Sequence, residues 1–287
     1  PIGILSGFAV GTHAEVYKLK DVFNPMTDDG GPNSGQVKVR SKSLTWEATP
    51  VLNSSGKVDI WMKKIPYDRF TSGLWYEDFG RNLDEKYVGS KGNMGLIFDK
   101  VDTIETEPDF RRTMAGLAGN IYANMNQREE DIAETFENSL NLLQDSVNNT
   151  KENVKINVIA GKGKTTEETD GVVGYDYETT GILALREVER TYKQTFGYSL
   201  GYLNTNFEFK DGNKSEEKSD TIQLGLHNKY RTNDWILKND LTGRISFYDI
   251  DRNLSWANAG KSNMTGNYET YSITSDNNLG KELSLGK

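Results

Sequence analysis

From residue 153 to the end of the chain, hydrophobic and polar residues alternate with a period of two, which is the repeat of a β-strand. In one segment Ile222, Leu224 and Leu226 share a face, and polar or small residues occupy the positions between them. The alternation divides into about six segments, near 153–163, 171–186, 190–210, 219–231, 234–250 and 267–281. A seventh segment begins at residue 282. The pattern predicts long antiparallel strands with one apolar face and one polar face.

Upstream, between residues 106 and 150, apolar residues recur every three or four positions, which is the period of an amphipathic helix. Thr106, Pro108 and Asp109 form a helix start, with a hydroxyl cap, a proline in the first turn and an acid. The first stripe is Phe110, Met114, Leu117, Ile121 and Met125. The second stripe is Ile132, Phe136, Leu140, Leu143 and Val147, and its opposite face carries Arg128, Glu129, Glu130, Glu134, Glu137 and Asp145.

The small residues of 115–119 predict a bend between the two stripes. A helix over about 128–148 would be roughly 30 Å long, which is close to the thickness of the hydrocarbon core of a bilayer.

Residues 1–105 consist of short strand-like runs separated by turn residues. The runs 36–40 and 58–62 follow turn-forming sequences at 28–35 and 52–57. An aromatic cluster in this region favours core packing over a binding surface. Its members are Tyr67, Phe70, Trp75, Tyr76 and Phe79.

The connections between the C-terminal strands alternate in length. Short turns are expected at 187–189 and 232–233, and long polar loops at 210–219 and 251–267. This alternation is typical of outer-membrane β-barrels, which have short turns on one side and long loops on the other. Aromatic residues near the strand ends predict interfacial girdles. They are Tyr175, Tyr177, Tyr192, Trp235, Tyr248 and Tyr268.

A soluble β-sandwich is the alternative, because its strands also alternate. Several segments here reach about 13 residues or more, whereas an ordinary strand has about 5–6. The polar face is rich in charged residues and glycine, which suits a water-filled lumen better than a dry core. The residues expected to line this lumen are Lys155, Gln223, His227, Lys229, Lys238, Asp240 and Arg244.

The composition narrows the functional classes. The 287-residue chain has a net charge of -8 and no cysteine. The acidic balance argues against a nucleic-acid partner, and the lack of cysteine excludes thiolate nucleophiles and Cys-based metal sites. No apolar run has the length of a transmembrane helix. We expect a fragment, because the chain begins at Pro1 and stops inside an apparent strand, so a missing signal peptide carries no information about export.

The sequence motifs that could indicate a catalytic or metal-binding site are weak matches. Residues 197–201, Gly-Tyr-Ser-Leu-Gly, match a nucleophile elbow, but they lie inside continuous strand alternation with no helix after them. His13 and His227 are far apart in sequence, and the acidic runs at 167–170 and 216–217 are typical of solvated loops. We therefore expect no catalytic residue, no metal site and no cofactor.

Several consecutive pieces resemble the translocator domain of monomeric (type Va) autotransporters, particularly the large fusobacterial adhesins. The resemblance covers about residues 106–287 and is specific in the order and spacing of its pieces. They are Lys-Ile-Asn-Val-Ile-Ala-Gly-Lys-Gly at 155–163, Gly-Tyr-Asp-Tyr-Glu-Thr-Thr-Gly at 174–181, Thr-Phe-Gly-Tyr-Ser-Leu-Gly-Tyr at 195–202, and Gln-Leu-Gly-Leu at 223–226 followed by Trp235.

The resemblance implies a mainly β fold: about six or seven of twelve transmembrane strands in 151–287, after a helical linker over 106–150. The segment 128–148 would thread the lumen, with Ile132, Phe136, Leu140 and Leu143 as pore-helix residues. Residues 1–105 would be the β-rich end of a passenger displayed at the cell surface. The implied partners are outer-membrane lipid, the barrel-assembly machinery and the passenger itself.

The chain departs from the family pattern in two respects. Only about half of the strands are present, and Lys287 stands where the family ends in an aromatic residue. An open half-barrel would leave unpaired backbone groups in lipid, so we expect that this fragment alone does not insert.

The leading interpretation is a non-enzymatic outer-membrane anchor that exports an adhesin-like passenger, whose host ligand the sequence does not name. Two alternatives stay open: a porin-like channel without a threaded helix, and a soluble β-rich binding domain. Some relatives release the passenger by asparagine chemistry in the pore. Asn148 and Asn149 lie near the right place, but their surroundings do not match that motif.

Overall fold

The computed structural model describes residues 13–24, 38–146, 150–165 and 171–281. The chain forms two compact units. The first contains residues 1–120 and 254–262, and the second contains 121–253 and 263–287. Among the described helices, none is both long and apolar enough to cross a membrane.

The first unit joins a small sheet to a set of helices. Its three antiparallel strands, in the order β1-β3-β2, are followed along the chain by four helices. The strands are β1 (Val16–Phe23), β2 (Trp46–Leu52) and β3 (Val58–Lys64), and the helices are α1 (Asp68–Thr71), α2 (Glu77–Glu85), α3 (Gly92–Val101) and α4 (Glu107–Leu117). Residues 53–57 form the tight turn between β2 and β3, where Gly56 has a positive φ of 74°.

The interpretation of residues 1–105 as short strands is wrong for 68–101, which form three helices. Part of this segment has buried residues spaced by four, three and four, which is a helical period. They are Tyr76, Gly80, Leu83 and Tyr87, and the residues between them include several that are common in turns. Residues 38–40 have no regular structure, and the rest of the expected strand 36–40 lies outside the described residues, as does the expected loop 28–35.

The aromatic cluster of the first unit lies mostly in its core. Tyr67 and Tyr76 are buried, and Phe70 and Phe79 pack against the same core, whereas Trp75 is 46% exposed. Core packing is therefore confirmed for four of these five side chains.

A buried carboxylate links separate elements of this unit. Asp102 accepts hydrogen bonds from Thr45 Oγ1 at 2.8 Å, from Tyr67 OH at 2.8 Å and from Tyr87 OH at 2.5 Å. Burial and the negative charge of Asp102 both raise the pKa of Tyr67 and of Tyr87 well above the ordinary tyrosine value.

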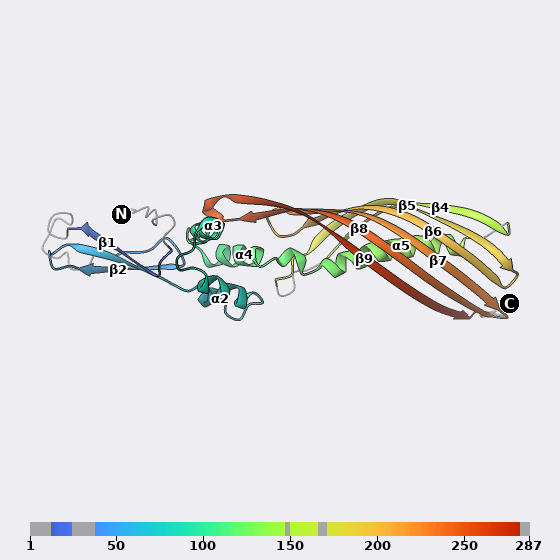
Figure 1. Cartoon of the computed structure of the whole chain (residues 1–287), viewed down its shortest axis with the longest axis horizontal. Coiled ribbons are helices and arrows are strands. Elements are labelled where there is room, and N and C mark those ends of the chain that lie inside the picture. Colours follow the sequence, from blue (N-terminus) through green and yellow to red (C-terminus); the bar gives the residue numbers. More distant parts are fainter. Residues whose placement is uncertain (1–12, 25–37, 147–149, 166–170, 282–287) are drawn as a thin grey trace, which may run out of the picture. The chain divides into compact units, whose positions relative to one another are not determined.

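The second unit consists of a long helix and six long strands. The strands form one antiparallel sheet in chain order, β4-β5-β6-β7-β8-β9. Helix α5 lies along the concave face of this curved sheet (Figure 1). The elements are α5 (Met125–Asp145), β4 (Glu152–Lys164), β5 (Tyr175–Thr191), β6 (Gln194–Phe209), β7 (Glu216–Thr232), β8 (Trp235–Ser255) and β9 (Lys261–Lys281).

The prediction of a mainly β chain, with a long helix ahead of about six antiparallel strands, is confirmed. The tight turns lie at 192–193 and 233–234, so the expected turn at 187–189 is wrong, because those residues pair within β5. The connections at 210–215 and 256–260 are shorter than expected, since β7 and β8 stay paired as far as Glu216 and Asp251. The expected seventh strand lies outside the described residues.

The two predicted helices are separate. The side chain of Thr106 caps α4 by accepting a hydrogen bond from the backbone N–H of Asp109. Gly119, with a φ of 87°, marks the break inside the small-residue run, and a 3-10 turn (Asn120–Tyr122) follows. Helix α5 begins at Met125, three residues before the predicted start.

The raised pKa values of Tyr67 and Tyr87 predict an alkaline instability of the first unit. A group whose folded pKa exceeds its unfolded value contributes stability that is complete below the unfolded value. This contribution is therefore complete at neutral pH and declines once the pH exceeds about 10, the value of an unfolded tyrosine.

Tryptophan fluorescence can follow this loss, because the first unit holds four of the five tryptophans, Trp46, Trp61, Trp75 and Trp256. The denaturant midpoint reported by fluorescence should fall between about pH 10 and pH 12. Absorbance at 295 nm should show a fraction of the tyrosines ionising only on unfolding. Ionisation of every tyrosine near pH 10 in the folded protein would contradict the prediction.

Candidate functional site: the two faces of the long sheet

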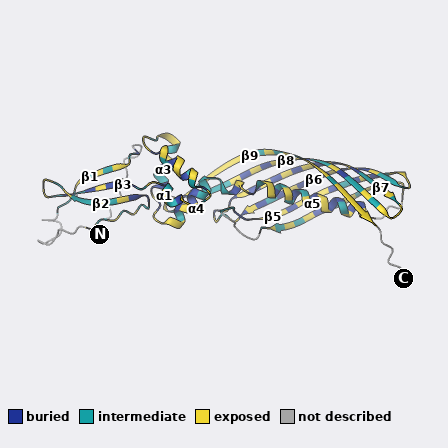
Figure 2. Cartoon of the chain, turned by 90° about the horizontal axis from the view of Figure 1, so that it is seen from below, coloured by how far each residue is buried: buried dark blue, intermediate teal, exposed yellow. Residues whose placement is uncertain are grey.

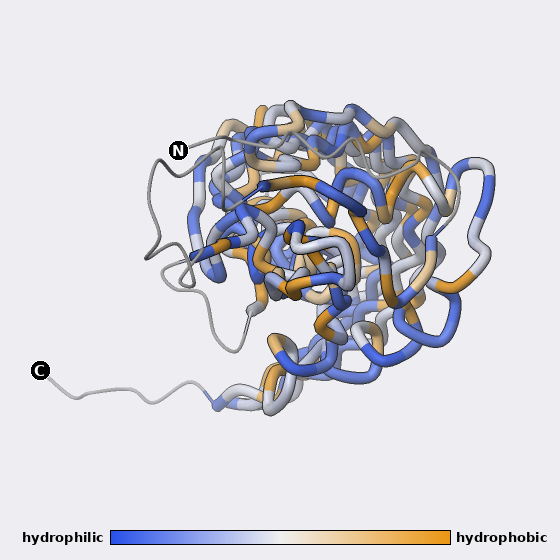
Figure 3. The backbone as a smooth tube through the Cα atoms, turned by 90° about the vertical axis from the view of Figure 1, so that its left-hand side faces the viewer, coloured by the Kyte–Doolittle hydropathy of each residue, from blue (hydrophilic) through white to orange (hydrophobic). Residues whose placement is uncertain are grey.

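The convex face of the six-stranded sheet exposes large apolar side chains. Along β6 and β7, exposed and buried residues alternate (Figure 2). Hydrophobic and hydrophilic stretches likewise alternate at short intervals along the chain (Figure 3). The exposed apolar residues include Val154, Ile156, Val158, Ile182, Phe196, Tyr198, Leu200, Tyr202, Ile222, Leu224, Leu226, Trp235, Leu237, Leu241, Ile245, Phe247, Tyr271 and Ile273.

The strand register aligns these side chains in rows across the sheet. One row is Val158, Ile182, Tyr202, Ile222 and Ile245, each paired with the next. Along β8 the apolar band runs from Trp235 to Phe247, which is about 40 Å of strand. A strand tilt of about 40° reduces this to a height of about 30 Å. The band therefore has the dimensions of a lipid-facing belt.

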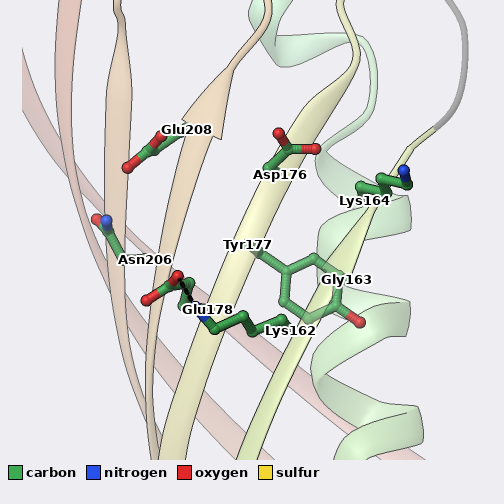
Figure 4. A pocket seen from close by; sticks show the side chains of 8 residues that line it. All are labelled: Lys162, Gly163, Lys164, Asp176, Tyr177, Glu178, Asn206 and Glu208. Atoms are coloured by element: carbon green, nitrogen blue, oxygen red, sulfur yellow. Dashed lines mark hydrogen bonds and ion pairs between the residues drawn. The ribbon is translucent and has the colours of Figure 1, made fainter.

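Charged rows bound the apolar band near the loops 165–174 and 210–215. Lys162 forms an ion pair with Glu178, and the next row places Lys164 beside Asp176 and Glu208. Figure 4 shows this cluster on β4, β5 and β6, together with Tyr177, whose ring lies over Gly163. The change from apolar to charged rows is typical of a membrane–water boundary.

The concave face buries α5 through an apolar stripe. Ile132, Phe136, Leu140 and Leu143 are all buried, and they share one hydrophobic core with side chains from the strands, among them Leu183, Leu203 and Phe207. Gly201 on β6 makes room for the helix, because a Cβ there would lie 2.5 Å from Phe136 Cε1. The small residues of the polar face thus admit large helix side chains.

A buried ion pair fixes the first turn of α5. Arg128 Nε donates to Glu217 Oε1 at 2.8 Å, and Arg128 Nη2 donates to Glu217 Oε2 at 3.2 Å. Both side chains are fully buried. Tyr268 OH also donates to Glu217 at 2.9 Å, and the guanidinium lies 5.0 Å from the centre of the Phe209 ring. Arg128, which was expected on the face opposite the apolar stripe, is instead buried against the sheet.

Tyrosines from the strands hydrogen-bond to acids on α5. Tyr175 OH donates to Asp131 at 2.5 Å, and Tyr248 OH donates to Glu129 at 2.6 Å. The girdle interpretation is therefore wrong for Tyr175, Tyr177, Tyr248 and Tyr268, because their positions in the alternation direct them to the concave face. Tyr192, which is 84% exposed, and Trp235 keep the outward position.

Basic residues surround the C-terminal end of α5. Lys155 Nζ donates to the carbonyl oxygens of Leu143 at 2.6 Å and Ser146 at 3.1 Å, and it pairs with Glu187 at 2.7 Å. Lys238 Nζ donates to Asp145 at 2.8 Å. Cations at this position satisfy the last carbonyl groups of a helix and complement its dipole.

The strand register brings a serine, a histidine and an aspartate together beside this helix end. His227 Nε2 lies 2.7 Å from Ser199 Oγ, and His227 Nδ1 lies 2.8 Å from Asp240 Oδ1. Gln144 on α5 donates to the same oxygen of Asp240 at 2.9 Å. Gly225 provides the space, because a Cβ there would lie 2.5 Å from Ser199 Oγ.

This order of hydrogen bonds matches that of a hydrolase triad, but the surroundings differ. Ser199 is a mid-strand residue paired with Leu185 on one side and Gly225 on the other, so ladder hydrogen bonds occupy the nearby backbone. Ser199, His227 and Asp240 are all buried. Gln144 of α5 donates to the Asp240 oxygen that His227 contacts, so the geometry supports a structural link between sheet and helix.

The concave face holds the residues that the sequence assigns to the lumen, although to differing depths. Four are buried: Gln223, His227, Asp240 and Arg244. The other three, Lys155, Lys229 and Lys238, are half-buried. Within the described residues, no group of three or more histidines or acids is placed to hold a metal.

Glu217, the partner of Arg128, was expected in a solvated acidic loop. The strand alternation, extended by two residues, instead directs Glu217 inward and Glu216 outward. The alternation itself was the available signal.

Comparisons with known proteins match both ends of the chain. A family model described as autotransporter beta-domain matches residues 154–287. A second model, described as BigA beta sandwich domain, matches residues 1–66. Neither curated proteins nor solved structures gave a match.

The buried ion pair predicts a non-additive pair of substitutions. Arg128→Met leaves Glu217 buried beside a single remaining donor, Tyr268, and should lower stability by about 3–5 kcal/mol. Glu217→Met should act in the same direction. The double variant should be more stable than either single variant, because no buried charge is left unpaired. Heat-modifiable mobility of the folded protein on gels provides the measurement, and additive losses would contradict the prediction.

The close approach at Gly201 predicts a size exchange. Gly201→Ala should lower the melting temperature of the second unit through overpacking worth about 1–3 kcal/mol. Phe136→Leu in the same chain should recover part of this loss, although it is destabilising by itself. Gly243→Ala is the matched control, because a Cβ at Gly243 meets nothing within 4 Å. Equal effects at Gly201 and Gly243 would count against the packing described.

Proposed function

We propose that this protein is an outer-membrane translocator that exports an adhesin-like passenger and displays it on the cell surface, because residues 154–287 match the autotransporter beta-domain model. Its strands anchor the protein in the outer membrane, and secretion follows the type V route that the family defines. The BigA beta sandwich match over residues 1–66 supports an adhesive passenger. The fusobacterial type of adhesin stays a prediction.

One observation carries the proposal: the two faces of the same sheet have opposite character. The convex face exposes apolar rows of membrane height, whereas the concave face is covered by an amphipathic helix held through Arg128, Glu129, Asp131 and Gln144. A soluble β-sandwich would bury the apolar rows. A water-filled channel would leave the opposite face open.

In this arrangement, α5 threads the lumen within the segment 128–148, and the helical linker 106–150 joins the passenger end, residues 1–105, to the barrel. Residues 151–287 form the N-terminal half of a twelve-stranded barrel. The edges of β4 and β9 pair with the remaining strands, because unpaired edges are not tolerated in lipid. The barrel-assembly machinery inserts the protein, and the passenger faces the outside.

The proposed role is non-enzymatic. Ser199, His227 and Asp240 act as a polar connection that holds the end of α5, and neither a cofactor nor a metal takes part. The residues proposed to line the lumen are Lys155, Gln223, His227, Lys229, Lys238, Asp240 and Arg244, with Ile132, Phe136, Leu140 and Leu143 on the pore helix.

Single-channel conductance in planar bilayers tests this proposal on the full-length protein. Deletion of residues 125–145 should raise the conductance severalfold, because the helix no longer fills the lumen. The control deletes a comparable length of the passenger end, residues 44–64, and should leave the conductance unchanged. A porin-like channel would show the same conductance with and without α5.

A second variant distinguishes loss of the helix plug from misfolding caused by the deletion. Arg128→Met with Glu217→Met keeps the chain length and removes only the polar contact of the first helical turn. This double variant should show frequent open–closed transitions in the same bilayers. Recovery of the wild-type protein in the soluble fraction of the cell envelope would overturn the proposal.

A further inference from the structure

The turn between β8 and β9 belongs to the first compact unit, although the strands that lead into it belong to the second. Residues 254–262 cluster with residues 1–120. Leu254 and Trp256 are 1% and 3% exposed, and they share a hydrophobic core with Phe98, Phe110 and Met114. We call residues 254–262 the hairpin tip.

Polar contacts hold the hairpin tip against α3 and α4. Thr113 Oγ1 donates to the carbonyl oxygen of Ser255 at 2.9 Å. Lys100 Nζ donates to Ser262 Oγ at 3.0 Å and lies 5.0 Å from the centre of the Trp256 ring. The indole N–H of Trp256 donates to the same Ser262 oxygen at 2.7 Å. The buried tryptophan therefore has its hydrogen-bond partner inside the contact.

Helix α4 has a glycine at the position where the hairpin tip packs against it. A Cβ at Gly116 would lie 2.6 Å from Leu254 Cδ1, so glycine at this helical position permits the close approach. The tip in turn holds Ala257 at a φ of 50°, which is uncommon for a residue other than glycine. Trp256 N donates to the carbonyl oxygen of Gly260 at 2.8 Å and closes the turn around this conformation.

The corresponding turn between β6 and β7 has a different character. Residues 210–215 belong to the second unit, and Asp211 closes the turn by accepting hydrogen bonds from Asn213 N at 2.7 Å and from the Ser215 side chain. That turn is polar, and its further contacts include hydrogen bonds with Asn253 on the neighbouring strand β8. The hairpin tip instead carries a large aromatic and a leucine whose burial depends on α3 and α4.

We infer that the hairpin tip is a folding platform for α3, the last helix of the passenger end, and for α4, the first helix of the linker. It supplies core residues without which α3 and α4 leave their apolar faces open, so the first unit completes its fold only on this turn of the barrel. The partner surface is the segment 92–117 of the same chain. This inference rests on the proposed function, because it requires β8 and β9 to be strands of an inserted barrel.

Covalent connection makes the docking efficient. Residues 118–124 are all that separate α4 from α5, and α5 is held on the strands by the contacts described above. Docking is then intramolecular, with an effective concentration set by a short linker. The paired strands β8 and β9 present the tip as soon as the barrel has formed, before the passenger end has folded.

Limited proteolysis of intact cells displaying the full-length protein tests the inference. Trp256→Ala should accelerate cleavage within residues 38–117 on the order of a hundredfold, because removal of a core tryptophan raises the open population by that factor. The matched control is Trp75→Ala, which removes a tryptophan that is 46% exposed in the same unit, and it should change the rate little.

A second variant leaves the tip itself intact. Gly116→Val should produce a similar acceleration by displacing Leu254 from the helix side, so it decides the question even where Trp256→Ala impairs barrel assembly. Gel mobility after heating reports barrel assembly separately. If the barrel forms and Trp256→Ala and Gly116→Val are cleaved at the rate of Trp75→Ala, the inference is overturned. If the wild-type full-length protein forms no heat-modifiable barrel, the proposed function fails instead.

Discussion

The ion pair between Arg128 and Glu217 imposes the main constraint on the second unit. Two charges buried together require ideal geometry, because desolvation of each costs several kcal/mol. The helix is therefore fixed at one height along β7, and its other contacts follow from that position. Phe136 faces Gly201, Gln144 reaches Asp240, and the last carbonyl groups of the helix meet Lys155. The sheet supplies the partners at intervals that match the rise of the helix.

The two faces of the same strands have different surroundings: the outward face is apolar and suited to lipid, and the inward face contacts α5. Alternation in a strand directs neighbouring residues to opposite faces, so each position that binds α5 adjoins a position that belongs to lipid. Leu200 and Tyr202 lie outward on either side of Gly201, which faces the helix. A shift of one residue in the register would bury the apolar rows and expose the charges. The helix contacts and the membrane belt therefore fix the same register.

The periodicity alone was enough to predict the strands, their facing and the long helix, because strands and amphipathic helices have distinct repeats. The helices of residues 68–101 were missed, since their buried positions, such as Gly80 and Leu83, are interspersed with glycine and polar residues. Arg128 and the inward tyrosines were misassigned for a different reason. A charged or aromatic side chain has two physically acceptable environments, and its residue type does not decide between them. For the tyrosines and Glu217 the strand alternation decides. For Arg128, on the helix, the partners across the sheet decide, and Glu217 and Tyr268 are far from it in sequence.

The contacts along α5 also define a mechanical end point. A shift of α5 by one helical turn, about 5.4 Å, would separate Arg128 from Glu217 and Gln144 from Asp240 together. Apolar packing alone would tolerate such sliding, since one leucine can replace another in an apolar groove. Under the proposed function, the polar side chains would therefore stop a chain that moves through the lumen at one defined residue.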